Sequence, residues 1–186
     1  MKQIKLLLGS LLIIFIFSCE GPTGPPGPPG FDGVDGLDGV NILGQVLEIE
    51  GTFSPSNNYS LFYEFPTTVE VFESDVVLVY ILWDETVDGN GEPVDIWRLL
   101  PQTRILNQGL LQYNYDFTFL DVSVFLESDF DLGSLQPGDT DNQIFRIAIV
   151  PAEFAQASKI DTSNIIEVMN SLNISEEEVG RIVLNN

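Results

Sequence analysis

Short stretches in which hydrophobic and polar residues alternate dominate the chain from about residue 44 onward. The clearest covers Tyr113–Phe119, where aromatic residues take the odd positions and polar residues the even ones. A period of two predicts a half-buried β-strand. After Phe119 the apolar residues move to even numbers, from Leu120 to Leu126, which predicts a β-bulge or a bend between two sheets. The segment Val76–Trp83 is apolar throughout, which predicts a central strand covered on both faces.

These stretches together predict a mainly β fold class, with a β-sandwich or jelly-roll-like domain over residues 44–151. Runs rich in Val, Ile, Phe and Tyr alternate with turn residues at the spacing that such domains have. The predicted strand regions are 45–50, 59–65, 68–72, 76–83, 95–100, 103–106, 111–127 and 143–150.

The last region, residues 152–186, changes to helical spacing and predicts two short helices packed on or beside the β domain. The first follows Asp161–Ser163, whose side chains are suited to capping. Ser175 and Glu178 match a capping box, which predicts the second helix. The apolar positions of the first helix are Ile165, Ile166, Met169 and Leu172.

The first 18 residues have the pattern of an export signal. Lys2 and Lys5 precede an apolar run that ends at Phe17, and this run is too short to span a bilayer, which takes about 20 apolar residues. The stretch Ile16–Cys19 resembles a lipobox, the motif of bacterial lipoprotein signals. The resemblance implies that Cys19 carries the lipid and anchors the mature chain in a membrane. A plain secretory signal with an incidental cysteine is the alternative.

Residues 19–43 contain seven consecutive Gly-X-Y triplets and predict an extended stalk. Only glycine fits at the axis where three polyproline-II chains wind together, and proline pre-sets the extended backbone. The segment resembles the collagen repeat. Seven triplets form a weak triple helix, so a homotrimer and a monomeric spacer remain equal alternatives. The glycines are Gly21, Gly24, Gly27, Gly30, Gly33, Gly36 and Gly39.

The position of these triplets directly after a lipobox resembles bacterial collagen-like lipoproteins. Three strand regions add to this resemblance: Asp75–Trp83, Trp97–Thr103 and Leu111–Phe119 are similar to the C-terminal domain of such proteins. The resemblance implies a surface location and no defined activity.

Charge and composition narrow the function further. The chain has 28 acidic residues against 7 basic ones, no histidine and a single cysteine. The strong negative field disfavours nucleic acid and anionic lipid headgroups, and it favours divalent cations or cationic partners. Without histidine, and with the only thiol used for lipid attachment, catalytic triads and most zinc sites are excluded. We therefore expect no enzyme activity and no cofactor, with calcium as the one candidate ion.

The calcium candidate is the loop Asp84–Asp95. Oxygen-bearing side chains occur at the spacing of an EF-hand loop, with glycine at the sixth position. The alternative, which the sequence favours, is an acidic hairpin loop whose Asp-Gly-Asn-Gly core suits positive φ angles. The candidate ligands are Asp84, Thr86, Asp88, Asn90, Glu92 and Asp95.

Trp83 and Trp97 lie in apolar stretches, so we expect them in the core rather than on a carbohydrate-binding surface. Exposure of either beside Tyr59 or Tyr80 would favour a glycan ligand.

The sequence thus predicts a non-enzymatic, membrane-anchored lipoprotein of the cell envelope, which presents an acidic β domain on a collagen-like spacer. The outer membrane is the expected location, and the sequence leaves open whether the domain faces the cell surface or the inner side of the membrane. The alternatives are a calcium- or glycan-binding module and a trimeric structural or adhesive component. The protein or glycan partner is not specified by these residues.

Overall fold

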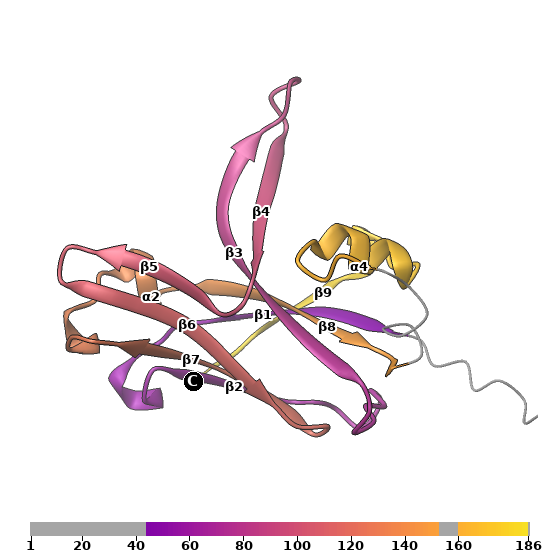
Figure 1. Ribbon diagram of the computed structural model, residues 1–186, viewed down its shortest axis with the longest axis horizontal. Helices are drawn as coiled ribbons and strands as arrows, with labels where there is room; N and C mark the ends of the chain where they lie inside the picture. The colour runs from indigo at the N-terminus through magenta and orange to yellow at the C-terminus, as the bar shows by residue number, and fades with distance from the viewer. Residues whose placement is uncertain (1–43, 153–159, 186) are drawn as a thin grey trace, which may run out of the picture. The chain divides into compact units, whose positions relative to one another are not determined.

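The computed structural model describes residues 44–152 and 160–185. The chain divides into two units, Met1–Gly39 and Val40–Asn186, and all described residues belong to the second. The predicted signal peptide, Cys19 and the triplet glycines lie outside the described residues. The described part is mainly β and contains two sheets (Figure 1), so the predicted fold class is confirmed at this level. None of its helices is long and apolar enough to cross a bilayer.

The larger sheet has five strands in the order β4-β3-β8-β1-β9. All neighbours are antiparallel except β1 and β9, which run parallel. The strands are β1 (Gln45–Gly51), β3 (Val76–Val87), β4 (Pro93–Leu99), β8 (Gln143–Val150) and β9 (Gly180–Val183).

The smaller sheet has four antiparallel strands in the order β2-β7-β6-β5. These are β2 (Ser60–Glu64), β5 (Gln102–Leu106), β6 (Gly109–Phe117) and β7 (Asp121–Ser128). The helical elements are η1 (Pro55–Asn57), η2 (Leu132–Ser134), α2 (Pro137–Thr140), α4 (Ile165–Ser171) and η3 (Glu176–Glu178).

The two sheets share one hydrophobic core, an arrangement compatible with a β-sandwich. Ile81 and Phe145 enter it from the larger sheet, and Tyr113 and Val124 enter it from the smaller one; all four are fully buried. The Tyr113 hydroxyl donates a hydrogen bond of 2.8 Å to the carbonyl of Asp139, which satisfies the one polar atom of that buried side chain.

The opposite face of the larger sheet is covered by the C-terminal region. Leu78, Tyr80 and Ala148 contribute alternate positions of β3 and β8 to a second cluster, and Val168 and Met169 of α4 pack onto them. The prediction that Val76–Trp83 contains a strand covered on both faces is therefore confirmed for its buried portion. Residues of α4 pack on this face of the larger sheet.

Two predicted strand regions differ from the structure. Residues 68–72 form no strand; the first two belong to a turn in which Val69 donates to the carbonyl of Pro66. The region 111–127 is a hairpin rather than one bulged or bent strand, since Phe117 on β6 pairs with Val122 on β7. The phase of the apolar residues changes because the chain reverses direction there, without glycine or proline in the turn.

The C-terminal end also differs from prediction. Asn164, rather than the Asp161–Ser163 side chains, caps α4 through its carboxamide oxygen. The predicted capping box of Ser175 and Glu178 is present, but it closes a single 3₁₀ turn, η3, instead of an α-helix. The chain then adds β9 to the edge of the larger sheet, which the helical prediction for residues 152–186 missed.

Candidate functional site

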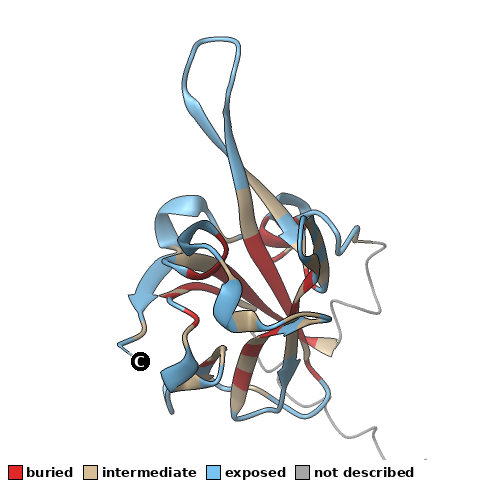
Figure 2. Cartoon of the chain, turned by 90° about the vertical axis from the view of Figure 1, so that its left-hand side faces the viewer, coloured by how far each residue is buried: buried red, intermediate tan, exposed pale blue. Residues whose placement is uncertain are grey.

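The hairpin of β3 and β4 extends beyond the sheet as an arm, which we define as residues 84–95. Every residue of the arm is exposed, and Figure 2 shows it in pale blue, projecting from the packed part of the domain. An isolated two-stranded hairpin is marginally stable in water because it has no hydrophobic layer to bury. The arm therefore offers both of its faces to solvent or to a binding partner.

A β-bulge at the base of the arm decides which side chains share a face. Leu82 pairs with Trp97, but the next pair joins Asp84 to Ile96, so Trp83 is the extra residue. The alternation along β3 shifts at this point. Below the bulge, even-numbered residues of β3 face the cluster that α4 covers; beyond it, odd-numbered residues face that side.

The tip of the arm is ordered by one carboxylate. Asp88 accepts hydrogen bonds from the backbone N–H groups of Asn90 at 2.7 Å and Glu92 at 2.9 Å. These bonds to Glu92 and Asn90 lower the pKa of Asp88 below its ordinary value. Gly91 takes the positive φ angle that the turn requires. Three predicted calcium ligands thus lie together in a self-contained turn, as the hairpin alternative predicted.

The other three predicted ligands do not join them. Asp84 and Thr86 pair with Ile96 and Val94, and Asp95 pairs with Glu85. Since successive residues of a strand point to opposite faces, Asp95 lies on the face away from Asp84 and Thr86. No cluster of three or more metal-ligating side chains exists within residues 44–152 and 160–185. Calcium binding by this loop stays a prediction.

A hollow of about 430 Å³ lies between the arm and the C-terminal region, and we call it the arm groove. Its walls combine apolar surface with carboxylates from three different elements. The arm and β4 form one wall, and α4 with η3 forms the other. Figure 1 shows the hairpin of β3 and β4 and the helix α4 from which these walls come. The groove is lined by Glu85, Pro93, Val94, Asp95, Trp97, Ile166 and Glu176.

Two carboxylates of the arm groove oppose each other directly. Glu85 and Asp95 are paired across β3 and β4, and residues paired in this way have their side chains on one face, about 5 Å apart at Cβ. Like charges at this spacing destabilise a sheet. Across the described residues, no ion pair reaches either carboxylate.

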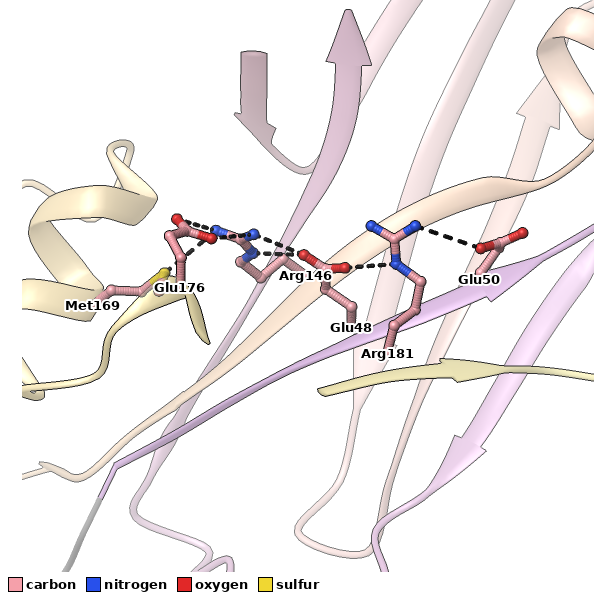
Figure 3. Close-up of polar contacts among 6 residues, drawn as sticks. All are labelled: Glu48, Glu50, Arg146, Met169, Glu176 and Arg181. Atoms are coloured by element: carbon pink, nitrogen blue, oxygen red, sulfur yellow. Dashed lines mark hydrogen bonds and ion pairs between the residues drawn. The ribbon is translucent and has the colours of Figure 1, made fainter. Parts of the chain in front are cut away.

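The arginines of the domain are engaged elsewhere, most of all Arg146 on β8. Its side chain donates to Glu48 at 2.7 Å and to Glu176 at 2.8 Å, and Glu48 in turn accepts a 2.7 Å bond from Arg181 (Figure 3). Arg146 is 3% exposed and Glu48 is 5% exposed. We call Glu176, Arg146, Glu48, Arg181 and Glu50 the ion-pair chain.

Burial and pairing act in opposite directions on Arg146. Burial lowers the pKa of its guanidinium, but the hydrogen bonds that it donates to Glu176 and Glu48 outweigh burial, so the pKa is raised. The guanidinium also lies 4.2 Å from the ring centroid of Trp97 and contacts the sulfur of Met169. Arg146 therefore stays charged and ties the C-terminal region to the sheet.

Arg98 and Arg104 are held by an aromatic ring. Their guanidinium carbons lie 4.3 and 4.6 Å from the ring centroid of Trp83, and Arg104 also forms a 2.9 Å ion pair with Asp139. Each arginine in the part of the chain that the structure describes thus contacts an aromatic ring, a carboxylate or both. Lys159 lies outside the described residues.

Both tryptophans are only partly buried, although we expected them in the core. Trp83 packs against the core between the sheets, and Trp97 packs against the cluster that α4 covers, which we call the outer cluster. Tyr80 is fully buried and donates to the carbonyl of Thr162, and burial raises the pKa of its phenol well above the ordinary value. Tyr59 packs against the core. The exposed tryptophan–tyrosine pair that would favour a glycan ligand does not occur at these positions.

A smaller hollow of about 290 Å³ lies on the smaller sheet, where Gln112, Glu127 and Asp129 contribute to its lining. Its carboxylates already have partners in the fold. Asp129 accepts a 2.8 Å bond from the backbone N–H of Leu110, and Glu127 accepts a bond from Asn114. The arm groove differs in that Glu85 and Asp95 accept no side-chain hydrogen bond among the described residues.

Sequence reasoning found Asp95 as a candidate site residue but missed Glu85, its neighbour across the arm. It also missed Trp97, Ile166 and Glu176 as partners in one groove. No local signal links them, because they come from β4, α4 and η3. No protein-family model, curated protein or solved structure matches this chain, so the geometry described above carries the functional argument.

Proposed function

We propose that the chain is a non-enzymatic lipoprotein of the cell envelope, anchored through a lipid on Cys19, which presents a sandwich-like acidic domain on a collagen-like spacer to a cationic partner. One observation carries the binding part of this proposal. The arginines of the described residues are engaged inside the domain, whereas Glu85 and Asp95 on the arm have no ion-pair partner there.

The charge distribution favours a basic ligand. With 28 acidic and 7 basic residues, the chain attracts cations over distances set by the Debye length, about 8 Å at physiological ionic strength. Such steering speeds encounter with an oppositely charged partner. The same negative charge repels anionic headgroups. A covalent lipid is therefore the physical means by which a chain of this charge stays at a membrane.

The absence of histidine from the sequence supports a non-enzymatic role. Histidine is the most common general acid–base group, and the one cysteine is assigned to lipid attachment. Carboxylate pairs such as Glu85 and Asp95 are weak evidence for glycoside hydrolysis, because a chain with 28 acidic residues has adjacent pairs by composition alone.

The anchoring part is tested by fractionating cells that express the wild-type chain or Cys19→Ser. We expect the wild-type protein in the membrane fraction and the variant in the soluble envelope fraction. A variant that stays in the membrane fraction would contradict the lipid anchor. Sedimentation of the lipid-free Cys19→Ser chain measures its mass in solution and so separates a trimeric stalk from a monomeric spacer. If the chain is a trimer held by a triple helix, replacing Gly27 and Gly30 in it should give monomers, because only glycine fits at the axis of that helix.

The binding part is tested with the full-length protein in detergent micelles and two short peptides of equal length, one rich in lysine and arginine and one rich in glutamate. We expect binding of the basic peptide alone, weakening as salt is raised because screening shortens the reach of the field. Failure of the basic peptide to bind at low salt would refute a cationic partner.

A further inference from the structure

We infer that the arm groove seats a basic side chain of a partner polypeptide, whose aliphatic stem packs on Trp97 and Ile166 and whose charged head lies between Glu85 and Asp95. This inference rests on the proposed function and makes it specific, because it assigns recognition to one groove rather than to the overall charge.

The size and the walls of the groove fit this occupant. Its volume of about 430 Å³ lies within the range of about 300 to 1,000 Å³ that ligand sites have. Ile166 is 48% exposed although apolar, and the exposed ring of Pro93, which lies on the same face of the arm as Asp95, adds apolar surface on the other wall. Lysine and arginine are the side chains that place an apolar stem on such surface while the charged head reaches polar groups.

A tryptophan ring and carboxylates also surround a guanidinium inside the domain. Arg146 lies 4.2 Å from the ring centroid of Trp97 while it binds Glu176 and Glu48. A tryptophan ring beside carboxylates is therefore an arrangement that this fold fills with a guanidinium. Trp97 also lines the groove, where the two carboxylates of the arm have no such partner among the described residues.

The groove favours a side-chain cation over a metal ion. A metal ion needs several ligands at about 2 to 2.6 Å, whereas no group of three metal-ligating side chains converges within the described ranges. A guanidinium or ammonium group at the end of a long side chain binds carboxylates that lie further apart than the ligands of a metal ion. Its binding would also neutralise the direct opposition of Glu85 and Asp95, which costs stability in the free protein.

Part of each wall of the groove is fixed before any ligand arrives. Glu176 forms two hydrogen bonds with Arg146, of 2.9 and 2.8 Å, and Trp97 packs against the outer cluster. A preorganised wall lowers the entropic cost of binding. The rest of the first wall is the arm, whose residues are exposed, so their side chains can adjust to the bound residue.

The test uses full-length protein in detergent micelles and two peptides, Gly-Ser chains that carry either Leu-Arg-Leu or Leu-Gln-Leu at the centre. Binding is measured by isothermal titration and by the chemical shift of the Trp97 indole N–H. We expect the arginine peptide to bind and to move the Trp97 signal, with at least tenfold weaker binding of the glutamine peptide.

Two charge-matched double variants locate the site. Glu85→Gln with Asp95→Asn removes the carboxylates of the groove and should weaken binding at least tenfold. The control, Glu64→Gln with Asp121→Asn, removes an acidic pair that is equally opposed across β2 and β7 but does not line the groove, and should weaken binding less than threefold. Ile166→Ala should weaken binding by removing the apolar wall. Far-UV circular dichroism confirms that each variant is folded.

The outcomes separate the inference from the proposed function. Equal weakening by both double variants, or equal binding of both peptides, overturns the groove as the site. If both double variants weaken binding equally, a general attraction to cationic partners still stands. Failure of the arginine peptide to bind the wild-type protein at low salt overturns both the groove and the cationic partner.

Discussion

The carboxylate of Glu48 and the carboxylates of the arm lie on the same face of the five-stranded sheet but differ in burial and in ion pairing. Glu48 is 5% exposed and contacts two arginines in the ion-pair chain. Glu85 and Asp95 are exposed, oppose each other across the arm and contact no arginine among the described residues. The bulge at Leu82–Asp84 places the second pair on this face.

The difference shows how a chain with few basic residues distributes them. Removing one partner of a buried ion pair leaves an uncompensated charge and costs several kcal/mol, whereas an exposed unpaired carboxylate is solvated at little cost. Arg146 and Arg181 therefore lie beside the buried carboxylate of Glu48, which would cost stability if it had no partner. The arm retains negative charge that no basic side chain among the described residues neutralises.

The largest expected effect is the loss of Arg146. We expect Arg146→Met to lower the free energy of unfolding by about 3–5 kcal/mol, because Glu48 stays buried with only Arg181 as a partner. Urea denaturation followed by tryptophan fluorescence measures the change. A loss below about 1 kcal/mol would contradict a structural role for the ion-pair chain.

Arg98→Met is the matched control. Arg98 also lies close to a tryptophan ring, 4.3 Å from the centroid of Trp83, but it is exposed and forms no ion pair among the described residues. A surface cation–π contact is worth about 0.5–1 kcal/mol, so we expect a loss of that size. Comparable losses in both variants would show that stacking, rather than the buried carboxylate, accounts for the effect of Arg146.

A smaller effect of opposite sign is expected in the arm. Glu85→Gln removes one of two opposed like charges and should raise the free energy of unfolding by about 0.2–1 kcal/mol at low salt. The gain should fade in about 1 M salt, where the Debye length shortens to about 3 Å. Urea denaturation at both salt concentrations measures it.

Adding Asp95→Asn to that variant should give little further gain, because the repulsion requires both charges; this is the coupling that a double-mutant cycle isolates. A loss of stability in Glu85→Gln at low salt would mean that this carboxylate makes a favourable contact and that the contrast with Glu48 is mistaken.

The sequence predicted those features that depend on local patterns. The apolar run at Val76 indicated a strand covered on both faces, and the spacing of Ser175 and Glu178 indicated a capping box; both are present. The strand β9 was missed because four exposed residues carry no alternating pattern. The turn between Phe117 and Val122 was mistaken for a bulge because it contains neither glycine nor proline.

The arm groove could not be predicted in the same way. Its walls meet only because Glu176 is held by Arg146, 30 positions away, while α4 packs its apolar residues on the sheet. The bulge that directs Glu85 toward this side depends on the pairing of β3 with β4, which local sequence does not reveal. The acidic loop was found from spacing alone, but spacing does not determine which residues of a hairpin share a face.

The smallest expected effect concerns Asp88, the carboxylate of the arm that the fold does use. The hydrogen bonds from Glu92 and Asn90 hold its pKa below the ordinary value of 3.8. Its contribution to the turn is therefore complete above that ordinary value and is lost as the pH falls through the lower folded value. The amide signals of Asn90 and Glu92 in a pH titration by NMR should move together below the ordinary value in the wild-type protein and lose this step in Asp88→Ala. A step at or above the ordinary value would show that the turn does not stabilise the charged form, and Asp88 would then belong with Glu85 and Asp95.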